Sequence, residues 1–195
     1  MRKIIISLIL LIVPLYAFSI EMSAGFKLGV LGISNVQDKA KTLEYTKLSF
    51  DGGAVFDLHF LRWLSCEVYI GYRNLGYRYD YDPYYGENFK RLWQHYHYFH
   101  LEATAKIYLI PRQKYLSFFV NLGGYFGILI KDGNDNDIGF SAGVGLGIKV
   151  KPKISVIVEL HGIFGLKNLG KPNASAQGPK NVAGYLQCGL LFDFR

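Results

Sequence analysis

The sequence contains little cysteine, with two in 195 residues. Cys66 and Cys188 both fall on the apolar side of alternating stretches that lie far apart in the chain. A disulfide requires two α-carbons within about 7 Å of each other. We therefore expect two small residues on apolar faces and no disulfide, even in an oxidising compartment.

The chain also lacks any long apolar run beyond its first residues. Its N-terminus has Arg2 and Lys3, then an apolar run over residues 4–13, and then small residues at alternate positions. This order is typical of a secretory signal peptide, and the run is shorter than the roughly 20 residues of a membrane-spanning helix. We predict a signal peptide over residues 1–19 and one exported domain over residues 20–195.

Concentrated charge of one sign is absent as well. The formal net charge of +7 falls to about +5 once Arg2 and Lys3 leave with the signal peptide. No cluster of basic residues suggests contact with nucleic acid, whose recognition depends on such patches. We expect no nucleic-acid partner.

The sequence does contain a strict alternation, which is clearest in the segment IGFSAGVGLGIKV, Ile138–Val150. Large apolar residues occupy one set of alternate positions, while glycine, serine and lysine occupy the other. A period of two predicts a β-strand. Such a strand, at about 3.3 Å per residue and tilted by roughly 40°, rises about 33 Å, enough to cross the ~25 Å apolar band of an outer membrane. The apolar face would then meet lipid, and the small, polar face would line a barrel.

The same alternation recurs through the chain. We predict eight strands, over residues 23–33, 49–60, 64–73, 93–109, 116–130, 138–150, 154–166 and 182–194. Long polar connections alternate with short ones, and the 15 tyrosines and 14 phenylalanines suit the aromatic girdles of membrane barrels. The predicted fold is all-β: an eight-stranded antiparallel up-and-down transmembrane β-barrel with short periplasmic turns and long extracellular loops.

Four segments carry a resemblance to a known family: HLEATAKIYLIPRQKYLSFFVNLGGYFGILI, IGFSAGVGLGIKV, HGIFGLKNLG and the terminal LLFDF. Over essentially its whole mature length the chain resembles the small outer-membrane barrels of the OmpX and PorT kind. The resemblance implies location in the cell outer membrane, outer-membrane lipid as surroundings, and the barrel-assembly machinery and periplasmic chaperones as partners. It also implies an assembly signal in the last strand, at Phe192 and Phe194, although Arg195 follows the terminal aromatic.

The face opposite the lipid collects charged residues and histidines. An eight-stranded barrel has room only for the side chains that fill it. We interpret these residues as a paired structural network that keeps buried charges satisfied, with an active site or an ion path as the alternative. The proposed members are Lys27, Asp51, Asp57, His59, Glu67, Arg73, His100, Glu102, Lys106, Lys149, Glu159, His161 and Asp193.

Motifs of known barrel enzymes are absent. Lipid A deacylases of the PagL kind carry a histidine, one spacer and a serine, and palmitoyl transferases of the PagP kind carry an Asp-Ser pair; neither occurs here. The acidic loop from Asp132 fails as an EF-hand, because Asp137 stands where glycine is required. His95 and His97 share one strand face and could bind a metal, but we interpret them as surface histidines near an aromatic girdle. We predict no catalytic residue, no cofactor and no metal site.

The function that these features favour is that of a monomeric, non-enzymatic integral barrel with a structural or surface-interaction role. Its extracellular loops would bind a surface ligand, which the sequence does not identify. A narrow channel, or porin, for ions or small solutes is one alternative, and an enzyme acting on lipid A is another. A soluble periplasmic ligand-binding barrel is a third, but it needs apolar residues inside and polar ones outside, the reverse of the predicted placement.

Overall fold

The computed structural model describes residues 20–37, 45–81, 90–112, 115–130, 136–166 and 180–194. The predicted signal peptide and most of the predicted long loops lie outside the described residues. The strands are β1 (Glu21–Gln37), β2 (Tyr45–Leu61), β3 (Leu64–Tyr81), β4 (Lys90–Ile110), β5 (Leu116–Leu129), β6 (Asp137–Lys151), β7 (Ile154–Gly165) and β8 (Lys180–Phe194). Within the described ranges, no helix has the length and apolar character needed to cross a membrane.

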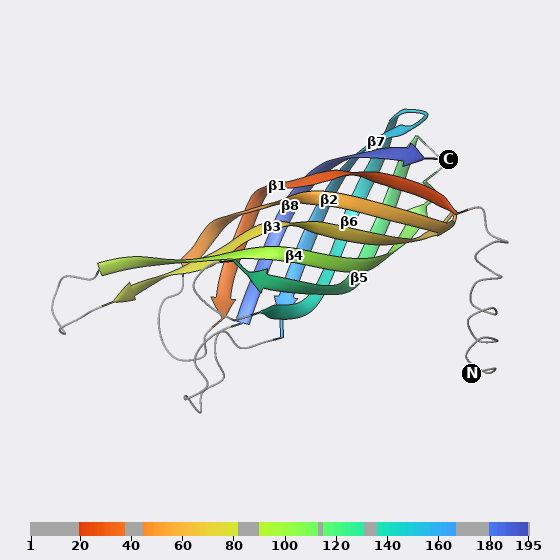
Figure 1. Cartoon of the computed structure of the whole chain (residues 1–195). Helices are drawn as coiled ribbons and strands as arrows, with labels where there is room; N and C mark the ends of the chain where they lie inside the picture. The colour runs from red at the N-terminus through yellow and green to blue at the C-terminus, as the bar shows by residue number, and fades with distance from the viewer. Residues whose placement is uncertain are drawn as a thin grey trace, which may run out of the picture.

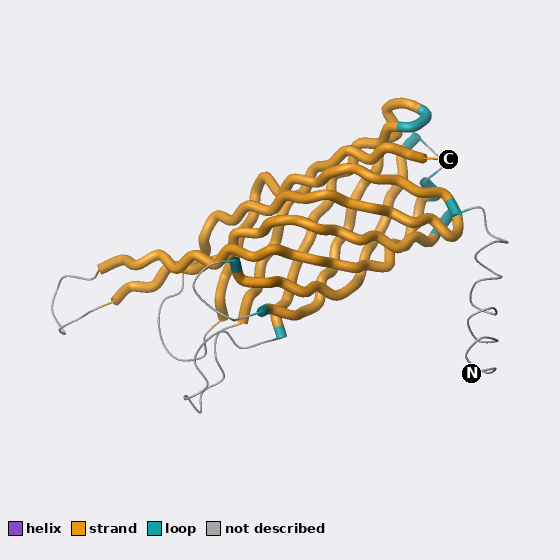
Figure 2. Tube along the Cα trace, viewed as in Figure 1, coloured by secondary structure: helices purple, strands orange, loops and turns teal. Residues whose placement is uncertain are grey.

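The eight strands close into a barrel in which each strand pairs antiparallel with its neighbours in the chain (Figure 1, Figure 2). β1 and β8 pair from Met22↔Phe194 to Gln37↔Lys180 and thereby close the sheet. Closure removes open sheet edges from the body of the barrel, which a membrane requires because lipid offers no hydrogen-bond partner. The predicted eight-stranded antiparallel barrel is confirmed.

Short turns gather at one end of the barrel, which we name the turn end. Arg62 and Trp63 join β2 to β3, and Pro152 and Lys153 join β6 to β7. The amide of Tyr108 donates a hydrogen bond to the carbonyl of Trp63 at 2.8 Å and braces the first of these turns. The opposite end, which we name the loop end, carries the connections that follow β1, β3, β5 and β7, as the alternation of long and short connections predicts.

Side chains alternate between the two faces of the strands. In β6, Ser141 and Gly145 are buried inside the barrel, whereas Phe140 and Val144 are exposed on its outside. Successive residues of a strand point to opposite faces, so one alternating sequence supplies both a small, polar lining and an apolar exterior. The face assignment predicted for β6 therefore agrees with the structure.

A bulge in β1 breaks the predicted alternation of its second half. Gly29 pairs with Asp51, but Gly32 pairs with Ser49, so β1 has one residue more than β2 in this stretch. The extra residue turns Gly32 inward, where an added β-carbon would lie 2.5 Å from both the Tyr185 ring and the carbonyl oxygen of Ser49. Glycine is required at this close approach, and a sequence alternation alone does not reveal the bulge.

β3 and β4 are longer than the sequence predicts. The alternation predicts strands that end at Arg73 and begin again at Trp93, but β3 continues to Tyr81 and β4 begins at Lys90. The two strands pair as far as Tyr81↔Lys90, whereas β4 and β5 pair only as far as Tyr98↔Leu129. Two strands can pair beyond the membrane without an apolar face, and tyrosine favours β structure. The other strands differ from their predicted bounds by a few residues at either end.

Both cysteines are free thiols on the outer face of the barrel. Cys66 in β3 is half-buried and Cys188 in β8 is exposed. Neither strand pairs with the other in the barrel, so the two thiols lie apart as expected.

Candidate functional site

The interior of the barrel holds most of the charged residues that the alternation places there. Eleven of the predicted members have at most 6% of their surface exposed: Lys27, Asp51, Asp57, His59, Glu67, Arg73, His100, Glu102, Lys106, Glu159 and His161. They come from β1, β2, β3, β4 and β7 and meet in the middle of the lumen. These residues form the candidate site because buried charges are uncommon unless they are paired or functional.

Two lysines and three carboxylates form the part of this network nearer the turn end. Nζ of Lys106 donates to Asp57 at 2.9 Å and to Oε2 of Glu67 at 2.5 Å. Nζ of Lys27 donates to Oε1 of the same Glu67 at 2.5 Å and to Glu159 at 2.8 Å. Each oxygen of Glu67 therefore binds a different lysine, and the carboxylate bridges β1 and β4.

A histidine arm continues the network toward the loop end. His161 lies between two carboxylates, with Nδ1 3.0 Å from Glu159 and Nε2 3.2 Å from Glu102. Nε2 of His100 lies 3.1 Å from Glu102 and 2.9 Å from Nη1 of Arg73. The chain of contacts thus crosses the lumen from β7 to β4 and on to β3.

Asp51 accepts the remaining hydrogen bonds of the network. It accepts hydrogen bonds from Nη2 of Arg73 at 2.8 Å, from the Tyr69 hydroxyl at 2.6 Å and from the Gln187 amide at 2.6 Å. The guanidinium of Arg73 also lies 4.9 Å from the centre of the Tyr185 ring. Tyr69, Tyr185 and Gln187 were absent from the predicted network, which contained only charged residues and histidines, although the alternation places all three on the inward face.

Every Lys, Arg, Asp and Glu side chain of this buried network has an opposite charge within 3.8 Å. A desolvated charge is costly on its own, whereas a paired and hydrogen-bonded charge is tolerated. The buried charges are therefore paired with one another inside the barrel. This pairing ties strands from opposite sides of the lumen to one another.

One apolar cluster lies at each end of the network. The cluster toward the turn end consists of Val55, Tyr69, Tyr108, Phe119, Ile157 and Leu191. The cluster toward the loop end consists of Leu75, Tyr98, Tyr125, Ile163, Ala183 and Tyr185. Nζ of Lys106 lies 4.7 Å from the centre of the Phe119 ring, where the network meets the first cluster.

The glycine-rich face of β6 makes room for this filling. An added β-carbon at Gly145 would lie 2.4 Å from Cζ of Phe119 and 3.0 Å from the carbonyl oxygen of Val158. Real β-carbons do not approach other atoms so closely, so the large ring from β5 occupies the space that a side chain on β6 would need. The small residues of the segment Ile138–Val150 are thus explained by what packs against them.

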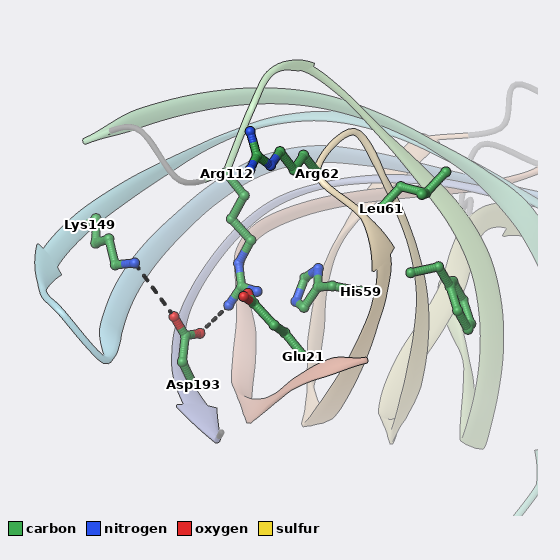
Figure 3. A pocket seen from close by; sticks show the side chains of 8 residues that line it. Glu21, His59, Leu61, Arg62, Arg112, Lys149 and Asp193 are labelled. Carbon is green, nitrogen blue, oxygen red and sulfur yellow. Dashed lines mark hydrogen bonds and ion pairs between the residues drawn. The ribbon is translucent and has the colours of Figure 1, made fainter. Parts of the chain in front are cut away.

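Lys149 and Asp193, the two remaining predicted members, lie apart from the buried part of the network. They lie at the mouth of the turn end, where 31% and 18% of their side-chain surface is exposed, and not in the buried interior. Lys149 is 3.9 Å from Asp193, and Arg112 from the turn between β4 and β5 binds the same carboxylate and Ser23. Figure 3 shows Lys149, Asp193 and Arg112 around this mouth, and the hollow that they line has a volume of about 400 Å³. Arg112 was read as part of a turn, so its reach into the mouth was missed.

His59 links the mouth to the interior. Its Nε2 lies 3.0 Å from the Ser23 hydroxyl, which in turn donates to Asp193 at 3.1 Å. Its Nδ1 lies 3.8 Å from the buried carboxylate of Asp57. This histidine is therefore the side chain through which the exposed ion pairs at the turn end approach the buried network.

The outer face of the barrel is apolar. Phe192 and Phe194, the predicted assembly signal, lie in β8 with 39% and 52% of their surface exposed, and Leu160 and Phe140 are exposed to a similar extent. A soluble protein seldom exposes so continuous an apolar surface. The placement is the reverse of a soluble ligand-binding barrel, with charge inside and apolar side chains outside.

Solved structures share this fold. Neisserial surface protein A is similar with a TM-score of 0.52 and 11% identity, over 89% of this chain and 97% of that one. OprG from Pseudomonas aeruginosa is similar with a TM-score of 0.53 and 10% identity, over 90% of this chain and 95% of that one. The outer membrane protease OmpT from Escherichia coli is more distant, with a TM-score of 0.40 and 12% identity over 89% of this chain and 97% of that one. Likeness at these identities shows the fold alone.

Sequence comparison gives the family. No curated protein matches the chain with significance. A profile of the outer membrane protein beta-barrel domain matches residues 17–170, which is more than half of the chain. The match agrees with the closed barrel, its apolar exterior and the predicted location in the outer membrane, and it removes the soluble periplasmic barrel from consideration. The chain therefore belongs to the family of the outer membrane protein beta-barrel domain.

Proposed function

We propose that this barrel is a closed, non-enzymatic anchor in the outer membrane that presents the extended β3–β4 hairpin as a binding surface outside the cell. The observation that carries the proposal is the difference in strand length at the loop end. β3 and β4 pair as far as Tyr81↔Lys90, while the β4–β5 pairing stops at Tyr98↔Leu129. The hairpin projects well beyond the rest of the barrel (Figure 2).

The reach of the hairpin supports a role at the surface. Residues 90–97 of β4 lie beyond the point where β5 ends its pairing, and eight residues of strand span roughly 26 Å. The paired segments read YRYDY on β3 and KRLWQ on β4. Tyrosine, tryptophan and arginine are the residues most enriched at the centres of protein interfaces. A two-stranded ribbon of this composition suits recognition of a partner in the surrounding medium.

The filled lumen supports an anchor over a channel. The ion-pair network occupies the middle of the barrel, and an apolar cluster lies on each side of it. Removing one member of such a network leaves a buried charge unpaired, so side chains do not readily move aside for an ion. Planar-bilayer recordings of the purified barrel are expected to show no discrete conductance. Regular single-channel steps would instead support the narrow channel.

The absence of enzymatic activity is part of the same proposal. It is supported by the missing His-spacer-Ser and Asp-Ser motifs, and by the internal pairing of the buried charges. Mass spectra of lipid A from a strain that lacks the protein are expected to match those of the parent strain. A lost or added acyl chain would contradict the proposal.

The hairpin is tested by shortening it. A variant in which residues 77–94 are replaced by a two-residue turn keeps the lipid-spanning part of β3 and β4. Cells that produce the full chain are expected to adhere to protein-coated or polysaccharide-coated surfaces. Cells that produce the shortened variant are expected to lose this adhesion. The variant must still run faster on a gel when it is not boiled, which reports a folded barrel. Equal adhesion by both kinds of cell would overturn the proposal.

Assembly by the barrel-assembly machinery with periplasmic chaperones, and a monomeric state, remain proposals. The exposed aromatic side chains of Phe192 and Phe194 at the end of β8 support recognition of the last strand. Replacing both by serine is expected to slow the appearance of the folded, heat-modifiable form in the outer membrane. Sedimentation in detergent tests the monomer.

A further inference from the structure

Two histidines project from the same side of β4 just above the body of the barrel. His95 and His97 are two residues apart, so both point outward, in phase with the exposed Phe99. Opposite them on β3 stand Gly76 and Asn74, which pair with His95 and His97 respectively. The imidazoles therefore share one face of the two-stranded β3–β4 ribbon.

The two imidazole rings are stacked along the strand face. Their centroids are 6.3 Å apart and their planes differ by only 7°. Two imidazoles on one tetrahedral ion, each at a metal–nitrogen distance of about 2.0–2.1 Å, have centroids about 5 Å apart. Because the nitrogen lone pairs lie in the planes of the rings, a shared ion requires the His95 ring to turn about its Cβ–Cγ bond until one of its nitrogens and Nε2 of His97 face the same ion.

Tyr72 holds one of the two rings in place. Its hydroxyl is hydrogen-bonded to Nδ1 of His97, and its ring stacks on the same imidazole with centroids 5.9 Å apart. A histidine that ligates a metal usually gives its other N–H to an oxygen atom, which fixes the tautomer. In the tautomer whose Nδ1–H donates to the Tyr72 oxygen, the lone pair of Nε2 on His97 is available to an ion.

The cross-strand neighbours suit a small cation. Asn74 stands directly opposite His97, where facing β-carbons lie about 4.5–5.5 Å apart, so its amide oxygen can reach a shared ion. Gly76 stands directly opposite His95 and has no side chain to contribute a ligand. No group of three His, Cys, Asp or Glu side chains gathers in the described part of the chain, so water must complete the coordination.

The pair is also accessible. The pairing of β4 with β5 ends at Tyr98, so His95 lies past the lipid-spanning part and is exposed. The other three histidines of the chain, His59, His100 and His161, are buried inside the barrel. Any imidazole-dependent binding from outside must therefore involve His95 and His97.

Contrary to the expectation from the sequence, we propose that His95 and His97 form a surface site for a divalent transition metal, Cu²⁺ or Zn²⁺, at the base of the β3–β4 hairpin. Imidazole nitrogen selects these borderline ions over Mg²⁺ and Ca²⁺, and the affinity order of such sites places Cu²⁺ above Zn²⁺. The site goes beyond the proposed role of the hairpin as a binding surface, and it does not depend on that role.

Calorimetry on the folded barrel in detergent, without a polyhistidine tag, tests the site. CuCl₂ and ZnCl₂ are expected to bind saturably with one ion per chain, and MgCl₂ is expected not to bind. His95→Ala and His97→Ala should each lower the affinity for Cu²⁺ by at least about tenfold. Tyr72→Phe should lower it by about tenfold through loss of ring orientation.

An exchange variant provides the matched control. His95→Arg combined with Arg91→His keeps the composition and the strand face but moves one imidazole about 13 Å along β4. The wild-type chain should show two nitrogen ligands in the Cu²⁺ electron paramagnetic resonance spectrum, and the exchange variant should lose the tight site. Unchanged Cu²⁺ affinity in the exchange variant, or a wild-type spectrum without two nitrogen ligands, would overturn the proposal.

Discussion

Lys27 of β1 and Glu67 of β3 meet in the middle of the lumen with 2.5 Å between Nζ and Oε1. These two strands are not neighbours in the sheet, because β2 lies between them. The second oxygen of Glu67 is held by Lys106 of β4. One carboxylate therefore joins side chains from three strands, and it does so where water is excluded and each charge depends on its partners.

Glu67→Gln should destabilise the barrel more than the removal of any exposed charged side chain. The substitution keeps the shape of the side chain but leaves Lys27 and Lys106 close together with less negative charge to balance them. Removal of one partner from a buried pair costs about 3–5 kcal/mol. The free energy of unfolding, measured by denaturant titration in detergent, should fall by this amount. Glu21→Gln at the exposed start of β1 is the control and should change little; equal effects of the two changes would contradict the buried network.

Arg112→Gln should have a smaller effect that depends on salt. Arg112 binds Asp193 and Ser23 at the mouth of the turn end, where the pair is partly exposed. Exposed ion pairs contribute about 0.2–1 kcal/mol and are screened by salt. The loss in unfolding free energy should therefore be below about 1 kcal/mol in dilute buffer and should shrink in 1 M NaCl. A loss as large as that of Glu67→Gln would show that Arg112 belongs to the buried network.

The alternation of side chains made the barrel predictable, because a period of two assigns every residue of a strand to one face. Lys106 and Glu159 could be placed inside from their positions alone. Their partners could not, since pairing across the lumen depends on the stagger and tilt of the strands. The contact of Lys27 with Glu159, between β1 and β7, follows from three-dimensional closure and leaves no local signal in the sequence.

Other features escaped prediction for physical reasons that differ from one another. The bulge near Gly32 inserts one extra residue into β1 without any change in composition. Beyond the bulge, residues that the alternation assigns to the outer face point inward, and the sequence does not mark this change. Beyond Arg73, no membrane imposes an apolar face, so the strand continues without the alternation that marks the others. Arg112 sits in a turn, where side-chain direction does not follow strand periodicity.

Gly145→Ala should destabilise the barrel even though alanine is small. The added β-carbon would lie 2.4 Å from Cζ of Phe119, so the ring or the strand must shift. Overpacking of this kind costs about 1–3 kcal/mol. Gly124→Ala, whose β-carbon would lie no closer than 3.5 Å to another atom, is the matched control and should be tolerated.

The cause can be isolated with a second change. Phe119→Leu shortens the side chain that faces Gly145, so the double variant should recover part of the stability that Gly145→Ala loses. Contacting residues typically show interaction energies of about 0.5–3 kcal/mol in such cycles. Strict additivity of the two changes would mean that the glycine is needed for another reason.

Val144→Arg should impair insertion into the membrane. Val144 lies near the middle of β6 and is exposed on the outer face, so an arginine there would face the centre of the lipid. Arginine at the bilayer midplane costs about 2–4 kcal/mol in such barrels. The folded fraction in lipid vesicles, read from the faster gel mobility of unboiled protein, should fall accordingly. Val144→Leu at the same position keeps the apolar face and should fold like the parent chain. If both variants fold equally well, the outer face of β6 does not meet lipid, and the membrane orientation of the whole barrel must be reconsidered.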